Sequence, residues 1–174
     1  MQIIDKYLSE LDYNKIKEKY QGPEVPWRFI KEANFNSSKV AFQFVYETYN
    51  MMWTDYEVPD ETKLLMDRLR HNKCQKVIRS KSNLFTKRQD VIKYGWHIDI
   101  EGLDKFKTLL YYINTNNGGT EFENGQFIKS VANRAVIVDG DIKHQSVGQT
   151  DEDIRLLINI NFLEEPWEIA KTEV

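Results

Sequence analysis

A series of short apolar runs in the second half of the chain decides the fold. The runs are KVIRSKSNLF (residues 76–85), YGWHIDI (94–100), FKTLLYYIN (106–114), TEFEN (120–124), RAVIVDG (134–140) and RLLININ (155–161). Polar turns with Gly118-Gly119, Asn124-Gly125, Asp139-Gly140 and Gly148 separate them. Short strands at regular spacing, with turn signals between them, are typical of an all-β sandwich or barrel.

The N-terminal part of the chain has a more helical pattern. Apolar residues recur at roughly helical spacing within residues 1–20, and Gly22-Pro23 and Pro26 would end that element. Residues 60–73 predict a second helix, while residues 40–49 predict a strand. We therefore expect one domain spanning residues 1–174. Its mainly β core would cover about residues 25–163, with helical decoration from residues 1–75 packed outside.

Composition and charge exclude several classes of protein. The chain has 174 residues, of which 41% are apolar and 13% aromatic, which is enough for a real core. The net charge of -3 argues against a protein built mainly to neutralise phosphates. Cys74 is the only cysteine, so no internal disulfide can form. The first twenty residues are charged throughout and no apolar run is long enough to cross a membrane, so we expect a cytoplasmic protein.

Three residues form a candidate metal site. His97 and Asp99 are two apart in a predicted strand, so both side chains would project from one face. His144 follows the strand that ends at Asp139-Gly140. Two imidazoles and one carboxylate leave open positions on a metal, which is the facial arrangement used for non-haem iron(II). The same pattern also fits a packed core histidine beside a turn aspartate.

A cation and several polar residues accompany this triad. Arg155 lies eleven positions after His144 and opens an otherwise apolar strand, where a buried guanidinium needs an anionic partner. A dicarboxylate would supply one, although a surface arginine at a strand end fits equally. Thr108 and Tyr112 share one strand face, so either hydroxyl could reach the same carboxylate or simply pack. Asn83 could also reach the site, or serve a turn.

The order of these motifs is similar to that of a known family. The segments are WHID (residues 96–99), YYINTNNGGTEF (111–122), NRAVIVDG (133–140), HQS (144–146) and RLLININF (155–162). Together they resemble the iron(II)- and 2-oxoglutarate-dependent oxygenases of the prolyl-4-hydroxylase-like superfamily, and look closest to small members from phages and marine microbes. The likeness covers about residues 25–163, including Pro26-Trp27 and Arg79 to Phe85.

This resemblance implies a double-stranded β-helix, or jelly-roll, core and a set of site residues. By position, His97, Asp99 and His144 match the iron ligands of the family. Arg155 matches the residue that binds the distal carboxylate of 2-oxoglutarate, and Tyr112 matches a tyrosine that assists there. The pocket for this cosubstrate would also be lined by Asn83, Leu110 and Ser146.

The resemblance further implies an activity. The protein would use Fe(II), 2-oxoglutarate and O2, with ascorbate in support, and would form succinate and CO2 while hydroxylating a C–H bond. Asp99 favours hydroxylation, because halogenating members lack this carboxylate. The substrate would be a peptidyl residue or a small metabolite. Arg155 stands where collagen-type prolyl hydroxylases often have lysine, so prolyl substrates are not supported.

Two alternatives stay open at this stage. A nucleic-acid oxygenase on the same scaffold is favoured by the basic segment 70–93. It is disfavoured by Asn161, which stands where a related demethylase group has a second arginine. The other alternative is a non-catalytic jelly-roll that binds a ligand or partner. No membrane partner is expected, the oligomeric state is left open, and a phage-encoded chain would act in the host cytoplasm.

Overall fold

The computed structural model describes residues 1–31, 41–51, 57–70 and 76–164. Its helices are α1 (Glu10–Gln21) and α2 (Asp60–Arg70). Its strands are β1 (Gln2–Ile4), β2 (Arg28–Ile30), β3 (Gln43–Asn50), β4 (Lys76–Thr86), β5 (Phe106–Tyr112), β6 (Gly119–Phe122), β7 (Phe127–Lys129), β8 (Arg134–Asp139), β9 (His144–Val147) and β10 (Ile154–Leu163).

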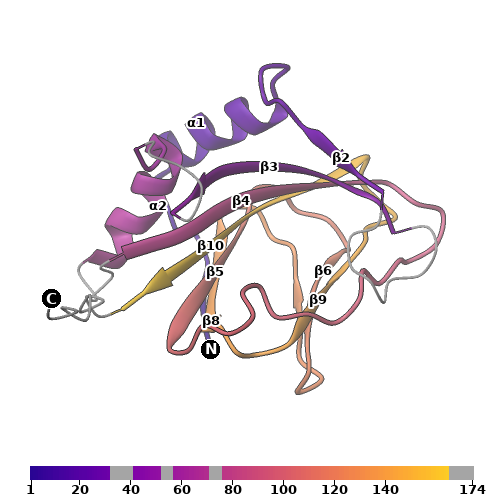
Figure 1. Ribbon diagram of the computed structural model, residues 1–174. Coiled ribbons are helices and arrows are strands. Elements are labelled where there is room, and N and C mark those ends of the chain that lie inside the picture. The colour runs from indigo at the N-terminus through magenta and orange to yellow at the C-terminus, as the bar shows by residue number, and fades with distance from the viewer. Residues whose placement is uncertain (32–40, 52–56, 71–75, 165–174) are drawn as a thin grey trace, which may run out of the picture.

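The described strands form two antiparallel sheets. The larger has seven strands in the order β1-β8-β5-β10-β4-β3-β2, and the smaller has three in the order β7-β6-β9. Figure 1 shows β6 and β9 beneath the long strands β4 and β10. This arrangement confirms the expected mainly β, jelly-roll class.

Side-chain alternation in the central strands divides the core in two. Leu109 and Tyr111 of β5 face the helices, in an apolar cluster with α1 and α2. Leu110 and Tyr112 of the same strand face the smaller sheet, in a second cluster that includes Phe122 of β6. Successive residues of a strand point to opposite faces, so one strand serves both layers. The inner layer is the one that can hold a site.

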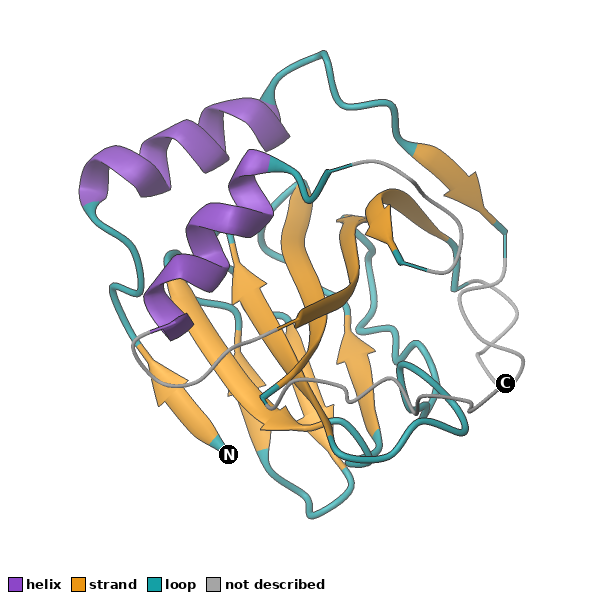
Figure 2. Cartoon of the chain, turned by 60° about the vertical axis from the view of Figure 1, so that its left-hand side comes forward, coloured by secondary structure: helices purple, strands orange, loops and turns teal. Residues whose placement is uncertain are grey.

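Both helices cover the outer face of the larger sheet (Figure 2). Ser9 caps α1, because its hydroxyl accepts a hydrogen bond from the backbone N–H of Asp12 at 3.2 Å. Ile16 and Tyr20 of α1 and Leu65 of α2 are buried against the sheet. In the described part of the chain, no helix is both long and apolar enough to span a membrane.

Three predicted boundaries differ from the structure. Residues 2–4 are not helical but form β1, an edge strand in which Gln2 pairs with Ile137 of β8. Helix α1 begins only after the Ser9 cap. Helix α2 ends at Arg70 within the described chain, and the rest of the predicted 60–73 helix lies outside the described residues. The predicted strand at 40–49 begins at Gln43, while residue 40 is also outside them.

Candidate metal centre

The structure brings His97, Asp99 and His144 together. One candidate ligand atom from each lies within 4.8 Å of the others. His144 opens β9, but His97 lies in the loop between β4 and β5 and not in a regular strand. The two histidines form an isolated bridge, in which each backbone N–H donates to the other's carbonyl oxygen at 3.0 Å. This bridge holds the two imidazoles side by side. It was not predicted from the sequence, because it joins residues far apart in the chain.

Local carbonyl groups orient both imidazoles. His97 Nδ1 lies 3.1 Å from the Gly95 carbonyl oxygen, and His144 Nδ1 lies 3.1 Å from that of Ile142. A carbonyl oxygen only accepts, so each Nδ1 carries the proton and each Nε2 keeps the lone pair needed for a metal. Burial lowers the pKa of His97, and the nearby His144 lowers it further, which favours the neutral form that ligates.

The carboxylate of Asp99 is held by donors from three strands. Asn159 Nδ2 donates to Oδ1 at 2.9 Å and to Oδ2 at 3.0 Å, and Asn161 Nδ2 donates to Oδ2 at 3.2 Å. Arg79 Nη2 lies 3.2 Å from Oδ1, and the Thr108 hydroxyl donates to Oδ2 at 3.2 Å. We call these four residues, Arg79, Thr108, Asn159 and Asn161, the Asp99 cradle.

The charges around Asp99 keep it ionised. Burial acts to raise its pKa, but the neighbouring His144, Arg79 and Lys81 outweigh burial and hold the pKa well below the usual range. The side chain of Asp99 is only 1% exposed. A buried, oriented carboxylate beside two imidazoles matches the donor set expected for iron(II) or a similar divalent metal.

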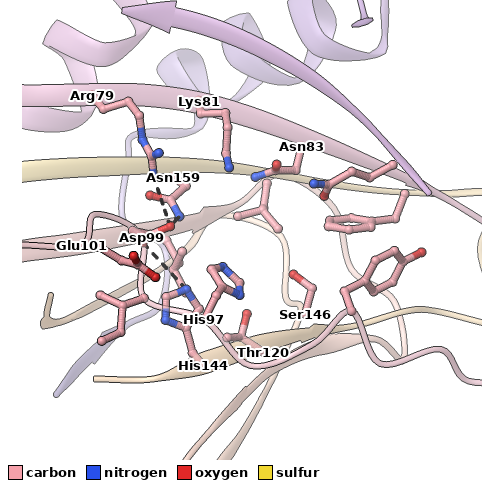
Figure 3. Close-up of a pocket in the computed structure, with 16 residues that line it drawn as sticks. Arg79, Lys81, Asn83, His97, Asp99, Glu101, Thr120, His144, Ser146 and Asn159 are labelled. Carbon is pink, nitrogen blue, oxygen red and sulfur yellow. Dashed lines mark hydrogen bonds and ion pairs between the residues drawn. The ribbon is translucent and has the colours of Figure 1, made fainter. Parts of the chain in front are cut away.

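A cavity of about 340 Å³ opens beside the triad. Figure 3 shows Arg79, Lys81 and Asn83 of β4 above the two histidines, with Thr120 of β6 and Ser146 of β9 beside them. The predicted pocket residues Asn83, Leu110 and Ser146 all lie in its wall. Sequence reasoning missed other wall residues, among them Lys81, Glu101 and Thr120.

Arg155 is completely buried and does not itself line this cavity, but it packs against one of the wall residues, Phe85. Its guanidinium carbon lies 4.9 Å from the ring centre of Phe85, a cavity wall residue, and 5.8 Å from that of Tyr112. Its Nε, Nη1 and Nη2 make no hydrogen bond in the described part of the chain. Burial lowers the pKa of Arg155, although the nearby Tyr112 and Tyr94 act to raise it. An arginine stays charged even so, which makes this an uncompensated buried cation.

The two predicted hydroxyl groups lie at opposite ends of β5. Tyr112 stacks near Arg155, and its hydroxyl donates to Thr120 Oγ1 at 2.8 Å. Thr108 was expected to help at the same carboxylate as Tyr112, but its hydroxyl lies in the Asp99 cradle. Three residues of β5 lie between the two positions, which share a strand face as predicted.

Comparison with solved structures identifies the fold. No family model and no curated protein matches the sequence. A prolyl-4-hydroxylase from Pseudomonas putida superposes with a TM-score of 0.64 and 13% identity, covering 94% of this chain and 92% of that one. A prolyl hydroxylase from Trichoplax adhaerens, solved with a hypoxia-inducible-factor peptide, gives 0.59 and 15%, covering 94% and 83%. HygX from Streptomyces hygroscopicus, with nickel and 2-oxoglutarate bound, gives 0.60 and 11%, covering 92% and 81%.

The chain has the fold of the 2-oxoglutarate-Fe(II) oxygenases. This agrees with the superfamily resemblance in the sequence; the narrower phage and marine-microbe type stays a prediction. In this structure His97, Asp99 and His144 converge between the two sheets, and Arg155 packs against Phe85 in the wall of the adjoining cavity.

Two of the Asp99 cradle residues could have been recognised in the sequence as unusual polar residues. Asn159 and Asn161 occupy alternate positions of the apolar strand β10, in the run LININF. Asparagine is rare on the buried face of a strand unless its amide has a partner. That alternation marks a polar cluster, but it could not name Asp99 as the partner.

Proposed function

We propose that this protein is an iron(II)- and 2-oxoglutarate-dependent oxygenase. His97, Asp99 and His144 would hold the metal. The observation that carries the proposal is the buried Arg155, which has no hydrogen-bond partner among the described residues. It packs against Phe85, a wall residue of the cavity that also borders the triad. A non-catalytic binding protein has no need for both features, and burying an unpaired guanidinium is costly unless a ligand pairs with it.

The residues along the cavity fit a five-carbon dicarboxylate. Arg155 would bind the distal carboxylate through two parallel N–H donors, a geometry for which the guanidinium fork is suited. The rings of Phe85 and Tyr112 flank the guanidinium and restrict its motion. Asn83, Leu110 and Ser146 would line the chain of the cosubstrate between Arg155 and the metal.

The metal and cosubstrate, when bound, supply the oxidising chemistry, with dioxygen consumed and succinate and CO2 released. The protein's part is to orient them and to hold protons in place. Asp99 stays ionised within its cradle and fills a ligand position, which supports hydroxylation of a C–H bond. A peptidyl residue or a small metabolite would be the substrate, and ascorbate would support turnover.

The nucleic-acid alternative is weakened by where the basic residues lie. Arg79 and Lys81 belong to the basic segment that favoured it, but both line the cavity and do not form an outer rim. Asn161 donates a hydrogen bond to Asp99 as part of the Asp99 cradle. The described part of the chain therefore offers less basic surface than the sequence suggested.

The direct test is succinate production from 2-oxoglutarate under air, with Fe(II) and ascorbate and no added substrate. We expect slow turnover in the wild-type protein and none in His97→Ala or His144→Ala. His71→Ala is a control that removes the remaining histidine of the chain. Equal turnover in the two ligand variants and the wild type would rule the proposal out.

A further inference from the structure

The inner face of β4 carries an unusual row of residues. Arg79, Lys81, Asn83 and Phe85 all line the cavity, at alternate positions of the strand. Ser80, between the first two, faces α2 and lies 2.8 Å from the hydroxyl of Thr62. Two cations on the inner face of a jelly-roll are costly without counter-charges, so each needs a physical account.

The two cations are in different situations. Arg79 is occupied, because Nη2 pairs with Asp99 at 3.2 Å and Nε donates to Asn161 Oδ1 at 3.1 Å. Lys81 makes no hydrogen bond or ion pair with any residue in the described ranges. Burial lowers the pKa of Lys81 and Arg79 lowers it further, against the opposing effect of Asp99 and Glu47. An ammonium group in this position lacks the partner that Arg79 has.

The register of the sheet places Lys81 at the metal end of the cavity. Lys81 is paired with Asn159, a cradle residue, whereas Phe85 is paired with Arg155. At roughly 3.4 Å per residue, those two points on β4 are about 14 Å apart. Figure 3 shows Lys81 and Asn83 directed from β4 toward the two histidines. Lys81 therefore lies at the end of the cavity away from the carboxylate proposed for Arg155.

The charges leave an excess of positive charge at this end. A divalent metal, Asp99, Arg155 and the two carboxylates of 2-oxoglutarate together sum to zero. Among the described residues, Arg79 and Lys81 are then balanced only by Glu101 in the cavity wall and by Glu47 on β3, and both of these carboxylates are exposed to solvent, which weakens their effect. A neutral substrate would leave this excess in place, whereas an anionic one would remove it.

We propose that Lys81 is the substrate anchor and that the oxidised substrate carries a carboxylate. This inference rests on the proposed oxygenase function and adds the chemical class of its substrate. The carboxylate would bind the Lys81 ammonium, which would place the rest of the molecule beside the metal. Arg79 would stay on Asp99 and would not take part in substrate binding.

Trifluoroacetate, observed by fluorine NMR, is a suitable probe. The protein would be loaded with Zn(II) and 2-oxoglutarate, which excludes turnover. Lys81→Met keeps most of the stem and removes the charge, and Lys81→Arg keeps the charge. Lys87→Met is a matched control at an exposed lysine whose ammonium donates to the Asp151 carbonyl oxygen. We expect trifluoroacetate affinity to fall about tenfold in Lys81→Met and to persist in the other two variants. Unchanged affinity in Lys81→Met would overturn the proposal.

A second arm separates substrate from cosubstrate. 2-Oxoglutarate affinity is measured on the same metal-loaded variants, and we expect Lys81→Met to match the wild type. A loss in that variant as large as its loss of trifluoroacetate binding would show that Lys81 serves the cosubstrate, and would overturn the substrate assignment. Wild-type protein that bound neither metal nor 2-oxoglutarate would instead contradict the oxygenase proposal. Lys81-dependent trifluoroacetate binding to metal-free protein would still identify the anion site in that case.

Discussion

The carboxylate of Asp99, a proposed metal ligand, is surrounded by hydrogen-bond donors. Two asparagines of β10, Arg79 of β4 and Thr108 of β5 all reach its two oxygens. Because each donor comes from a rigid strand, the carboxylate has little rotational freedom. The cradle therefore prepares the ligand before a metal arrives, and the cost of ordering it falls on folding.

We predict that Asn159→Leu lowers metal affinity. The variant removes two of the hydrogen bonds to Asp99, and loss of such partners weakens metal binding by roughly 10–100-fold. Competition of the metal-loaded protein with a chromophoric chelator measures this, and Asn117→Leu, at an exposed asparagine paired with Thr150, is the control. Equal metal affinity in Asn159→Leu and wild type would show that the cradle does not prepare the ligand.

We predict a pH dependence of stability that comes from His97. Its pKa is lowered in the folded state from the ordinary value of 6.5, so the unfolded chain binds the proton more readily. The stabilising contribution is present above pH 6.5 and is lost as the pH falls through the folded pKa. Urea unfolding of metal-free protein at about pH 7 and about pH 5 should show a smaller pH effect in His97→Gln than in wild type. The same loss of stability in both proteins would contradict this assignment.

At the level of elements, the sequence predicted strands better than it predicted the loop that matters most. The strands around residues 76–85, 106–112, 134–139 and 154–163 follow from their apolar runs and turns. The loop carrying His97 and Asp99 looked like a strand, because WHIDI alternates. Its actual conformation depends on isolated bridges to β9, Lys93 with Val147 and His97 with His144, and local sequence pattern cannot contain such contacts between distant residues.

Contacts between residues distant in sequence also explain why β1 and the Asp99 cradle were not predicted. Ile3 and Ile4 have helical spacing with Tyr7, but pairing with β8 takes residues 2–4 into the sheet. Tertiary pairing of this kind overrides local propensity. Arg79 and Asn159 could be recognised as polar residues in apolar strands, yet their shared partner lies in another element. The triad was predicted because its residue types are rare and its chemistry is distinctive.

We predict that Gly119→Ala disrupts the small sheet. A Cβ at Gly119 would lie 2.2 Å from the Ile128 carbonyl oxygen, a backbone atom that β7 pairing holds in place. Overpacking of this kind costs about 1–3 kcal/mol of unfolding free energy. In Gly148→Ala the nearest atoms, Ile92 O and a Tyr94 ring carbon, lie at 3.4 Å, so that variant is the milder control. Urea denaturation measures both, and equal stability would contradict the packing argument.

For the whole molecule, the larger sheet serves two purposes. Its outer face packs on α1 and α2 through one apolar cluster, and its inner face shares a second cluster with the smaller sheet. The cavity lies on the inner side, where β4, β5 and β10 meet β6 and β9. The helices therefore stabilise the larger sheet on the face opposite the cavity.

We predict that metal and 2-oxoglutarate together raise the melting temperature. A ligand that binds only the folded state adds about 2.7 kcal/mol when present at 100 times its dissociation constant. Thermal unfolding with Zn(II) alone, and with Zn(II) and 2-oxoglutarate, separates the two contributions. Succinate, which lacks the keto group, is the control and should stabilise less. No shift with either ligand would contradict a site shared by both.

The central claim is that the buried Arg155 receives the distal carboxylate of 2-oxoglutarate. The most direct measurement is an anaerobic titration of the Fe(II)-loaded protein with 2-oxoglutarate, in wild type and in Arg155→Met. The control is Arg134→Met, at an arginine paired with Asp5 near the surface. We expect saturable binding to wild type and to Arg134→Met. In Arg155→Met we expect a loss of affinity of at least about 100-fold, with metal binding retained. Equal 2-oxoglutarate affinity in all three folded proteins would show that Arg155 does not bind the cosubstrate.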